Sequence, residues 1–95
     1  MTAGRGAQRL DKWLWCARLF RTRRAASDFV EQSSVRLTRH QKAQRVEKPG
    51  FTLKEGDEIA FALGDSLMIV RVMGFAERRP SPAGAALLMK RIDQL

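Results

Sequence analysis

The chain of 95 residues contains few of the residue types that build metal centres, disulfide frameworks or membrane spans. Cys16 is the only cysteine and His40 the only histidine, so neither an internal disulfide nor a zinc site of paired cysteines and histidines is expected. The apolar runs are far shorter than the roughly 20 residues that cross a bilayer. The opening MTAGRGAQ lacks the apolar centre of a signal peptide. We therefore expect a cytoplasmic protein without a metal or other cofactor.

Catalytic side chains are equally scarce. His40 stands alone in a basic segment, and we interpret it as an exposed or RNA-adjacent side chain rather than a catalytic base. Cys16 follows Trp15 and has no neighbouring histidine, which favours a packing role. The glycines do not show the spacing of a phosphate-binding loop. Asp28 follows Arg24 by four residues, which predicts a surface ion pair on a helix. The sequence thus indicates a protein that is not an enzyme.

Positive charge is abundant, and it lies in the first half of the chain. Residues 1–48 contain 12 of the 18 lysines and arginines but only 4 of the 10 aspartates and glutamates, so this half carries the whole formal charge of +8. A concentrated positive field selects polyanions as partners. Nucleic acid is therefore the first hypothesis, and a solvated basic face that keeps the protein soluble is the alternative.

Two short helices are predicted within this basic half. The first lies in RLDKWLWCARLF, with Asp11 as candidate N-cap and a buried stripe at helical spacing that consists of Leu10, Trp13, Leu14 and Ala17. Thr22 is the candidate N-cap of the second, which ends near Ser33 and Ser34. Its apolar face is predicted to consist of Ala25, Ala26, Phe29 and Val30. The stripe places Trp13 in the core, whereas Trp15 points elsewhere, either under a C-terminal helix or toward bases.

The second half reads as strands followed by a helix. A short strand is expected near Val35 and Leu37, and residues 38–50 are expected to be mainly a loop. The apolar runs EIAFAL and SLMIVRVMGF, separated by Gly64 and Asp65, predict a β-hairpin with a tight turn. After the break PSPAG, Ser81 is a candidate N-cap and Pro82 the first helical residue of a helix over about 83–93. Its packing residues are predicted to be Ala86, Leu87, Met89 and Ile92.

Several basic side chains on a rigid scaffold are what phosphate binding requires, because guanidinium groups make paired hydrogen bonds to phosphate oxygens. Two packed helices with a short connection bring such residues together at their exposed junction. The basic residues of the first half that we predict to contact RNA are Arg9, Lys12, Arg18, Arg21, Arg23, Arg24, Arg36, Arg39 and Lys42.

The stretch from Arg9 to Phe61 resembles the S-four-type RNA-binding domain, also called the alpha-L motif. The resemblance lies in RLDKWLW, RLFRTRRAASDFVEQ, SVRLT and LKEGDEIAF. The WLW after RLDK and the later RRPSPAGAALL are similar to the heat shock protein 15 class. The implied fold is α+β, with two packed N-terminal helices on a small, mainly antiparallel sheet. We expect a disordered N-terminus over residues 1–8, the RNA-binding domain over 9–73 and a C-terminal extension with a helix over 74–95.

The resemblance also implies a function and a contact surface. It implies binding to ribosomal RNA, and for the closer class binding to the free large ribosomal subunit that holds a stalled peptidyl-tRNA after heat stress. The family's RNA-contacting positions fall on Arg9, Lys12, Arg18, Thr22, Arg23 and Arg24, which adds Thr22 to the charged set. Where the family often has a glycine before the strand and an Asn-Gly turn after it, this chain has Ser33-Ser34 and Thr38-Arg39.

Two other functions stay open at this point. The chain could be an RNA-binding module that acts with a separate RNA-modifying enzyme, which would show as co-purification with an activity-bearing subunit. An electrostatic binder of anionic membranes would need a basic amphipathic helix with an exposed apolar face. We favour a monomer that docks its helix pair onto structured RNA.

Overall fold

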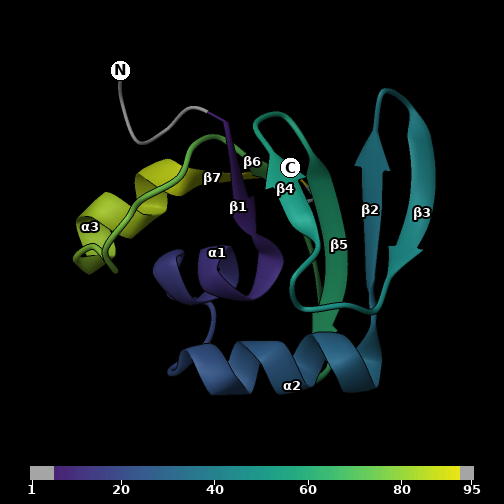
Figure 1. Ribbon diagram of the computed structural model, residues 1–95, viewed down its shortest axis with the longest axis horizontal. Coiled ribbons are helices and arrows are strands. Elements are labelled where there is room, and N and C mark those ends of the chain that lie inside the picture. The colour runs from purple at the N-terminus through teal and green to yellow at the C-terminus, as the bar shows by residue number, and fades with distance from the viewer. Residues whose placement is uncertain (1–5, 93–95) are drawn as a thin grey trace.

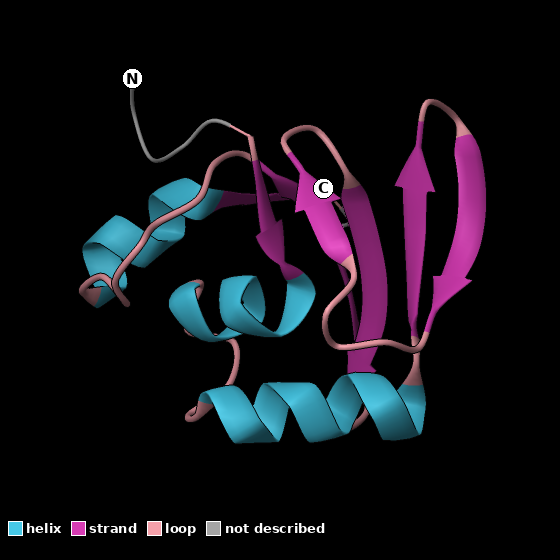
Figure 2. Cartoon of the chain, viewed as in Figure 1, coloured by secondary structure: helices cyan, strands magenta, loops and turns pink. Residues whose placement is uncertain are grey.

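Antiparallel strands form the frame of the molecule, as the computed structural model of the chain shows for residues 6–92 (Figure 2). The larger sheet has the order β3-β2-β5-β6-β7. Its strands are β2 (Val35–Arg39), β3 (Lys42–Val46), β5 (Glu58–Leu63), β6 (Ser66–Val72) and β7 (Met89–Arg91). A second sheet pairs β1 (Ala7–Arg9) with β4 (Thr52–Lys54). The predicted α+β class and its mainly antiparallel sheet are confirmed.

Three helices complete the fold. They are α1 (Leu10–Cys16), α2 (Arg23–Ser33) and the short α3 (Pro82–Ala85), which continues into a 3-10 turn over Ala86–Leu88. In Figure 1, α1 and α2 lie against each other, the β2–β3 hairpin stands at the right edge and α3 lies at the far left. Within the described residues no helix is long and apolar enough to cross a membrane.

Helix α2 begins where the sequence predicts. The Thr22 side chain accepts a hydrogen bond from the Ala25 N–H at 2.9 Å, which satisfies one of the unpaired N–H groups of the first turn. Ala26 and Val30 are fully buried, whereas Ala25 is exposed, so its assignment to the apolar face is wrong. The Phe29 ring packs edge-on against Phe61 of β5, with 6.0 Å between centroids. This contact fixes α2 on the sheet.

Helix α1 starts differently from the expectation. Asp11 is its second residue and not its N-cap, which is Arg9. The first-turn N–H groups of Leu10 and Asp11 donate instead to the main-chain oxygens of Phe51 and Pro49, at 2.8 and 3.0 Å. Because the loop before β4 already satisfies these donors, the Asp11 carboxylate is left to bind other groups.

The end of α1 is closed by a backbone motif that normally uses glycine. Arg18 has φ of 62°, and its N–H donates to the Trp15 oxygen while the Leu19 N–H donates to the Leu14 oxygen. These two bonds are those of a Schellman motif, whose left-handed residue is usually glycine because a Cβ is strained there. An arginine at this position therefore places a charged side chain directly at the turn between α1 and α2.

The expectation that residues 38–50 are mainly a loop is wrong. Strand β3 pairs with β2 over its whole length, from Val46 opposite Val35 to Lys42 opposite Arg39. The turn between them is His40 and Gln41, both with positive φ (53° and 66°), so it falls after the Thr38-Arg39 pair. Such a two-residue turn normally contains Asn and Gly. The sequence does not predict β3, because Val46 is its only buried residue and the strand has no apolar alternation.

The two ends of the described chain also differ from the expectation. Ala7 and Gln8 are in β1, opposite Lys54 and Leu53, so the expected disorder is wrong for these two residues. Residues 1–5 and 93–95 lie outside the described residues. Ser81 and Pro82 start α3 as predicted, since the Ser81 hydroxyl accepts from the Gly84 N–H. The predicted helix over 83–93 is wrong beyond the 3-10 turn, because the chain then enters β7 and pairs with β6.

The core lies between the helices and the larger sheet. Trp13 is fully buried, and its Nε1–H donates to the Gly74 oxygen at 2.9 Å, which confirms the predicted core position. The other fully buried apolar side chains include Leu10, Leu14, Val30, Leu37, Leu53, Ile59, Val70 and Val72. Of the packing residues predicted for the C-terminal helix, Ala86 and Leu87 are exposed, so these two assignments are wrong, and Met89 and Ile92 are half-buried. Ala85 and Leu88 are buried instead.

Candidate nucleic-acid interface

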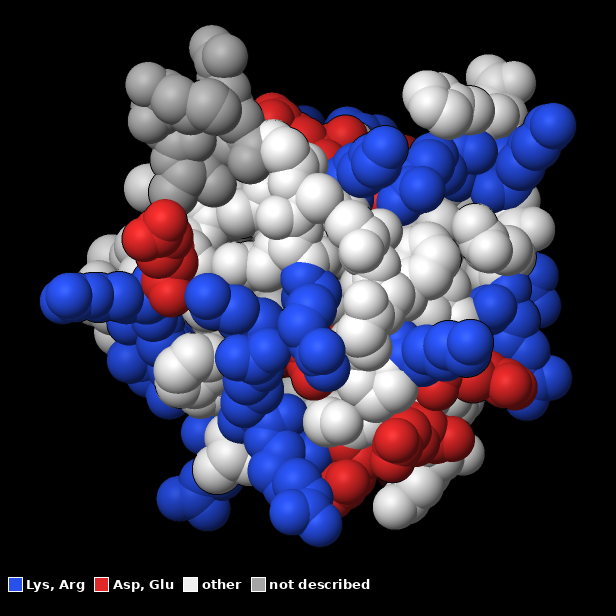
Figure 3. Space-filling model, viewed as in Figure 1, with Lys and Arg blue, Asp and Glu red and all other residues white. Residues whose placement is uncertain are grey.

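All but one of the predicted RNA-contacting residues lie on two separate surfaces. In Figure 3 one group of basic side chains runs over α1 and the first half of α2, and another lies over the tip of the β2–β3 hairpin. We call the first the helix corner. It comprises Arg9, Lys12, Arg18, Arg21, Thr22, Arg23 and Arg24. The second, the hairpin surface, comprises Arg39 and Lys42, which face each other across the strands. Arg36 lies farther along β2, and the alternation of the strand puts its side chain on the opposite face of the sheet from that of Arg39.

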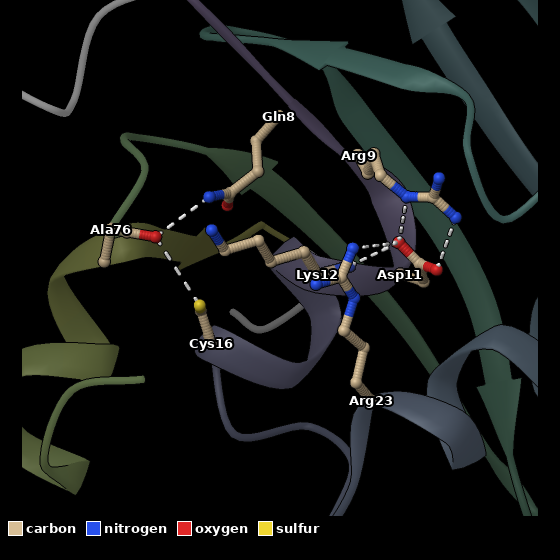
Figure 4. A network of polar contacts seen from close by, with 7 residues as sticks. All are labelled: Gln8, Arg9, Asp11, Lys12, Cys16, Arg23 and Ala76. Carbon is tan, nitrogen blue, oxygen red and sulfur yellow. Dashed lines mark hydrogen bonds and ion pairs between the residues drawn. The ribbon is translucent and has the colours of Figure 1, made fainter. Parts of the chain in front are cut away.

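At the helix corner, one buried carboxylate gathers two arginines from different segments (Figure 4). The Nε and Nη2 of Arg9 donate to Oδ1 and Oδ2 of Asp11, each at 3.0 Å. Arg23 Nη2 lies 3.8 Å from Oδ1, which also accepts the Lys12 N–H at 2.7 Å. The side chain of Asp11 is only 5% exposed. The guanidinium groups of Arg9, just before α1, and Arg23, at the start of α2, therefore both lie beside the Asp11 carboxylate.

The electrostatics of this cluster favour the ionised carboxylate. Burial raises the pKa of Asp11, but the Arg9 hydrogen bond, the Lys12 N–H and the charges of Arg9 and Arg23 outweigh it and hold that pKa below its usual range. The same hydrogen bond and charge raise the pKa of Arg9. The cluster therefore contains two cations against one fixed anion.

The arginines of the helix corner remain open to a ligand. The side chains of Arg9 and Arg23 are 55% and 44% exposed, although both approach Asp11. Arg24 is 87% exposed and lies 3.4 Å from Asp28, which confirms the predicted pair at i,i+4 spacing. Arg21 is also exposed. A phosphate group can reach these guanidinium groups without any change in the fold.

Three other residues of the helix corner are used differently. The Lys12 side chain is half-buried and extends away from Asp11, toward Gln8 (Figure 4). The Thr22 hydroxyl caps α2, so its contribution to the surface is to fix the start of that helix. Arg18 Nε donates to the Pro80 oxygen at 2.8 Å, which joins the turn after α1 to the C-terminal segment.

That C-terminal segment supports the helix corner in a way the sequence did not reveal. Arg79 Nε and Nη2 donate to the oxygens of Trp15 and Phe20, at 3.0 and 2.8 Å, and its guanidinium lies over the Trp15 ring. Trp15 was expected under a C-terminal helix or against bases, and it is half-buried under Arg79 instead. In the sequence, only the pattern Arg78-Arg79-Pro80 draws attention to Arg79. This pattern does not show whether an arginine supports the fold or binds a ligand.

Cys16, at the end of α1, contacts the C-terminal segment. It is fully buried, and its thiol donates to the Ala76 oxygen at 3.6 Å (Figure 4), in agreement with the predicted packing role. Burial raises the pKa of this thiol, although the charges of Lys12, Arg23 and Arg79 act against that shift. Residues 6–92 contain no group of three or more metal-ligating side chains.

On the hairpin surface, Arg39 is committed to the fold. Its Nε and Nη2 donate to the two oxygens of buried Asp57 at 2.8 and 2.7 Å, and Nη2 also donates to the Thr52 oxygen at 3.1 Å. The sequence indicated Arg39 as a contact but not Asp57 as its partner. An open hollow of about 320 Å³ beside this pair is lined in part by exposed His40 and Lys54.

Lys42 of this surface is exposed, and so is Arg36 on the other face of the sheet. Arg36 stands directly opposite Arg45 across β2 and β3. Like charges in direct cross-strand positions reduce sheet stability. Arg45 lies 3.1 Å from Glu47, which partly offsets this repulsion.

Comparison with known proteins gives a consistent set of relatives. No family model matches the chain. The chain is 39% identical to a heat shock protein 15 homolog of Aeromonas salmonicida over 85 residues, which are 90% of this chain and 61% of that protein. It is 33% identical to the RQC P-site tRNA stabilizing factor of Halalkalibacterium halodurans over 69 residues, 73% of each chain.

A solved structure shows the same fold. Heat shock protein 15 of Vibrio cholerae, described as trimeric, superposes with a TM-score of 0.76 at 26% identity, covering 92% of this chain and 83% of the other. The chain spans only 61% of the length of the Aeromonas relative.

Proposed function

Because the chain is a member of the heat shock protein 15 family, we propose that it binds ribosomal RNA through the helix corner. We propose as its target the free large ribosomal subunit that carries a stalled peptidyl-tRNA after heat stress. The names of the relatives support this target, since one group is named for heat shock and another for stabilising a P-site tRNA.

The observation that supports RNA binding most directly is the arrangement around Asp11. Two guanidinium groups from different segments are held side by side at an exposed corner, with Arg24 nearby. Arginine presents a planar fork of donors that matches phosphate oxygens. Structured RNA displays phosphates and 2′-hydroxyls in a fixed geometry. A rigid array of arginines therefore suits recognition of RNA shape better than reading of sequence.

The mode of action that follows is binding without catalysis. The names of the relatives, heat shock protein 15 and RQC P-site tRNA stabilizing factor, include no reaction, which supports this proposal. We propose a cytoplasmic location, because the target is the ribosome. The monomeric state expected from the sequence stays a prediction, which the mass of the purified chain in solution checks, with the trimeric Vibrio relative as the contrasting case.

Gradient sedimentation of cell lysates tests this function. We expect the tagged chain to migrate with free large subunits, and to a greater extent after heat shock, when more of them carry peptidyl-tRNA. Release of the nascent chain and tRNA before centrifugation should lower that fraction. A chain that stays at the top of the gradient under all conditions, or that follows small subunits, would overturn the proposal.

A parallel titration separates RNA from membrane binding. The purified chain is mixed with large-subunit RNA or with vesicles of anionic phospholipid, under the same buffer and salt. We expect saturable binding to the RNA and at least tenfold weaker binding to the vesicles. Equal binding to the two would favour a general affinity for anionic surfaces over an RNA site.

A further inference from the structure

We propose that Asp11 is a positioning residue for RNA binding: its buried carboxylate aligns Arg9 and Arg23 for phosphate contact, so that removing this negative charge weakens binding to RNA. This inference rests on the proposed function and adds to it an acidic residue that a polyanion would be expected to repel.

The fold holds the Asp11 carboxylate in place. The main-chain N–H of Asp11 donates to the Pro49 oxygen, and the adjacent Leu10 N–H donates to the Phe51 oxygen. The Lys12 N–H reaches Oδ1 at 2.7 Å. With the side chain almost fully buried, the carboxylate has little freedom to turn away. It is therefore a fixed point on which mobile arginine side chains can be ordered.

The contact with Asp11 orders the Arg9 side chain and leaves some of its N–H donors available for a ligand. A guanidinium has five N–H donors, of which Arg9 directs one from Nε and one from Nη2 at Asp11. The three remaining donors are free of Asp11, and more than half of the side chain faces solvent. Gly50 lies beside this group, where an added Cβ would come within 3.4 Å of Arg9 Nη1. The absence of a side chain there leaves the outer edge of the guanidinium open.

Arg23 approaches the same carboxylate from the first residue of α2, at 3.8 Å. Without Asp11, these two positive side chains would repel each other and sample many rotamers. Ordering a long side chain on binding costs a factor of roughly 2 to 12 in affinity. For two side chains the loss would be roughly 4- to 140-fold. Asp11 removes this loss by ordering both before RNA arrives.

The sign of the effect separates positioning from simple electrostatics. Asp11→Asn raises the net charge by one, which by itself would strengthen binding to a polyanion. Positioning predicts the opposite, a loss of roughly 4- to 140-fold in affinity for large-subunit RNA. The matched control is Asp28→Asn, which also removes a carboxylate beside an arginine but leaves the Arg9 and Arg23 contacts intact. We expect this control to bind as tightly as wild type or tighter.

A second variant tests the same point without altering the buried residue. Arg9→Lys keeps the charge but cannot make the paired contact with Asp11. We expect it to weaken RNA binding, whereas Arg78→Lys, at an exposed side chain outside both predicted surfaces, should change affinity less than twofold. Circular dichroism at the binding temperature confirms that each variant is folded before its affinity is compared.

A double-mutant comparison then assigns the route of the effect. If Asp11 acts through the two arginines, Asp11→Asn should produce no further loss in an Arg9→Ala, Arg23→Ala background. Two results would overturn the positioning role and leave the proposed function standing. One is wild-type affinity in a folded Asp11→Asn variant. The other is that Asp11→Asn lowers affinity as much in the Arg9→Ala, Arg23→Ala background as it does in the wild-type chain. Absence of wild-type binding to large-subunit RNA overturns the proposed function, and the positioning role with it.

Discussion

The guanidinium of Arg79 lies 5.5 Å from the centre of the Trp15 ring, and its Nε donates to the main-chain oxygen of the same residue at 3.0 Å. A second bond, from Nη2, reaches the Phe20 oxygen. The last carbonyl groups of a helix have no partner within it. Arg79 adds a second donor to the Trp15 oxygen, which also accepts the Arg18 N–H, and it bonds the Phe20 oxygen in the linker to α2. The C-terminal segment therefore stabilises the helix corner.

Arg79→Ala should therefore destabilise the whole domain. Loss of partly buried hydrogen bonds from a charged donor predicts a decrease of about 1.5–3 kcal/mol in the free energy of unfolding, measured by urea titration. Arg78→Ala is the control, because that exposed side chain should contribute less than about 0.5 kcal/mol. Equal stability of the two variants would show that the Arg79 contacts do not hold the corner.

Replacement of Trp13 should affect folding and not binding alone. Truncation of a fully buried aromatic to alanine costs about 3–5 kcal/mol, and here it also leaves the Gly74 oxygen without its partner. We expect Trp13→Ala to unfold at a much lower temperature or to be insoluble. A variant with the wild-type melting temperature that has lost RNA binding would place this ring at the interface.

The lowered pKa of Asp11 predicts a defined dependence of stability on pH. A carboxyl whose pKa is lower in the folded than in the unfolded state stabilises the fold above its unfolded pKa, and this contribution is lost as the pH falls through the folded value. The stability difference between wild type and Asp11→Asn should be constant near pH 7 and shrink below about pH 4. A difference that does not change over this range would contradict the charged contact.

Local signals were enough to predict several elements. The hydroxyl of Thr22 and the apolar spacing after it identify α2, and Gly64 supplies the positive φ that the β5–β6 turn requires. Ser81 and Pro82 correctly mark the start of α3. In each case, the residues that specify the element are adjacent in sequence.

Elements that depend on distant partners could not be predicted in this way. Strand β3 is a polar edge strand with a turn that lacks glycine, so only its pairing with β2 defines it. Residues 86–92 have helical apolar spacing, but residues 89–91 form β7 because β6 offers an open edge. Local propensity is a weak guide where such pairing is available.

The candidate site, too, could be predicted only in part from the sequence. Charge distribution predicted that arginines gather at the junction of the two helices, and the structure brings Arg9 and Arg23 together there. The sequence could not show that Asp11 organises them, because an aspartate near a helix start is usually a cap. That role follows from the loop carbonyls that already satisfy the first turn.

The central claim, that the helix corner binds RNA, is tested most directly by titrating Arg23→Ala, Arg24→Ala against large-subunit RNA over a series of salt concentrations. Each phosphate contact contributes about 0.7 to 0.9 to the slope of log affinity against log salt, so the double variant should bind more weakly with a slope shallower by about one to two. Its melting temperature should stay close to that of wild type, because Arg24 is 87% exposed and Asp11 keeps both hydrogen bonds from Arg9 when the 3.8 Å contact of Arg23 is lost. Unchanged affinity and slope in the folded variant would contradict the account.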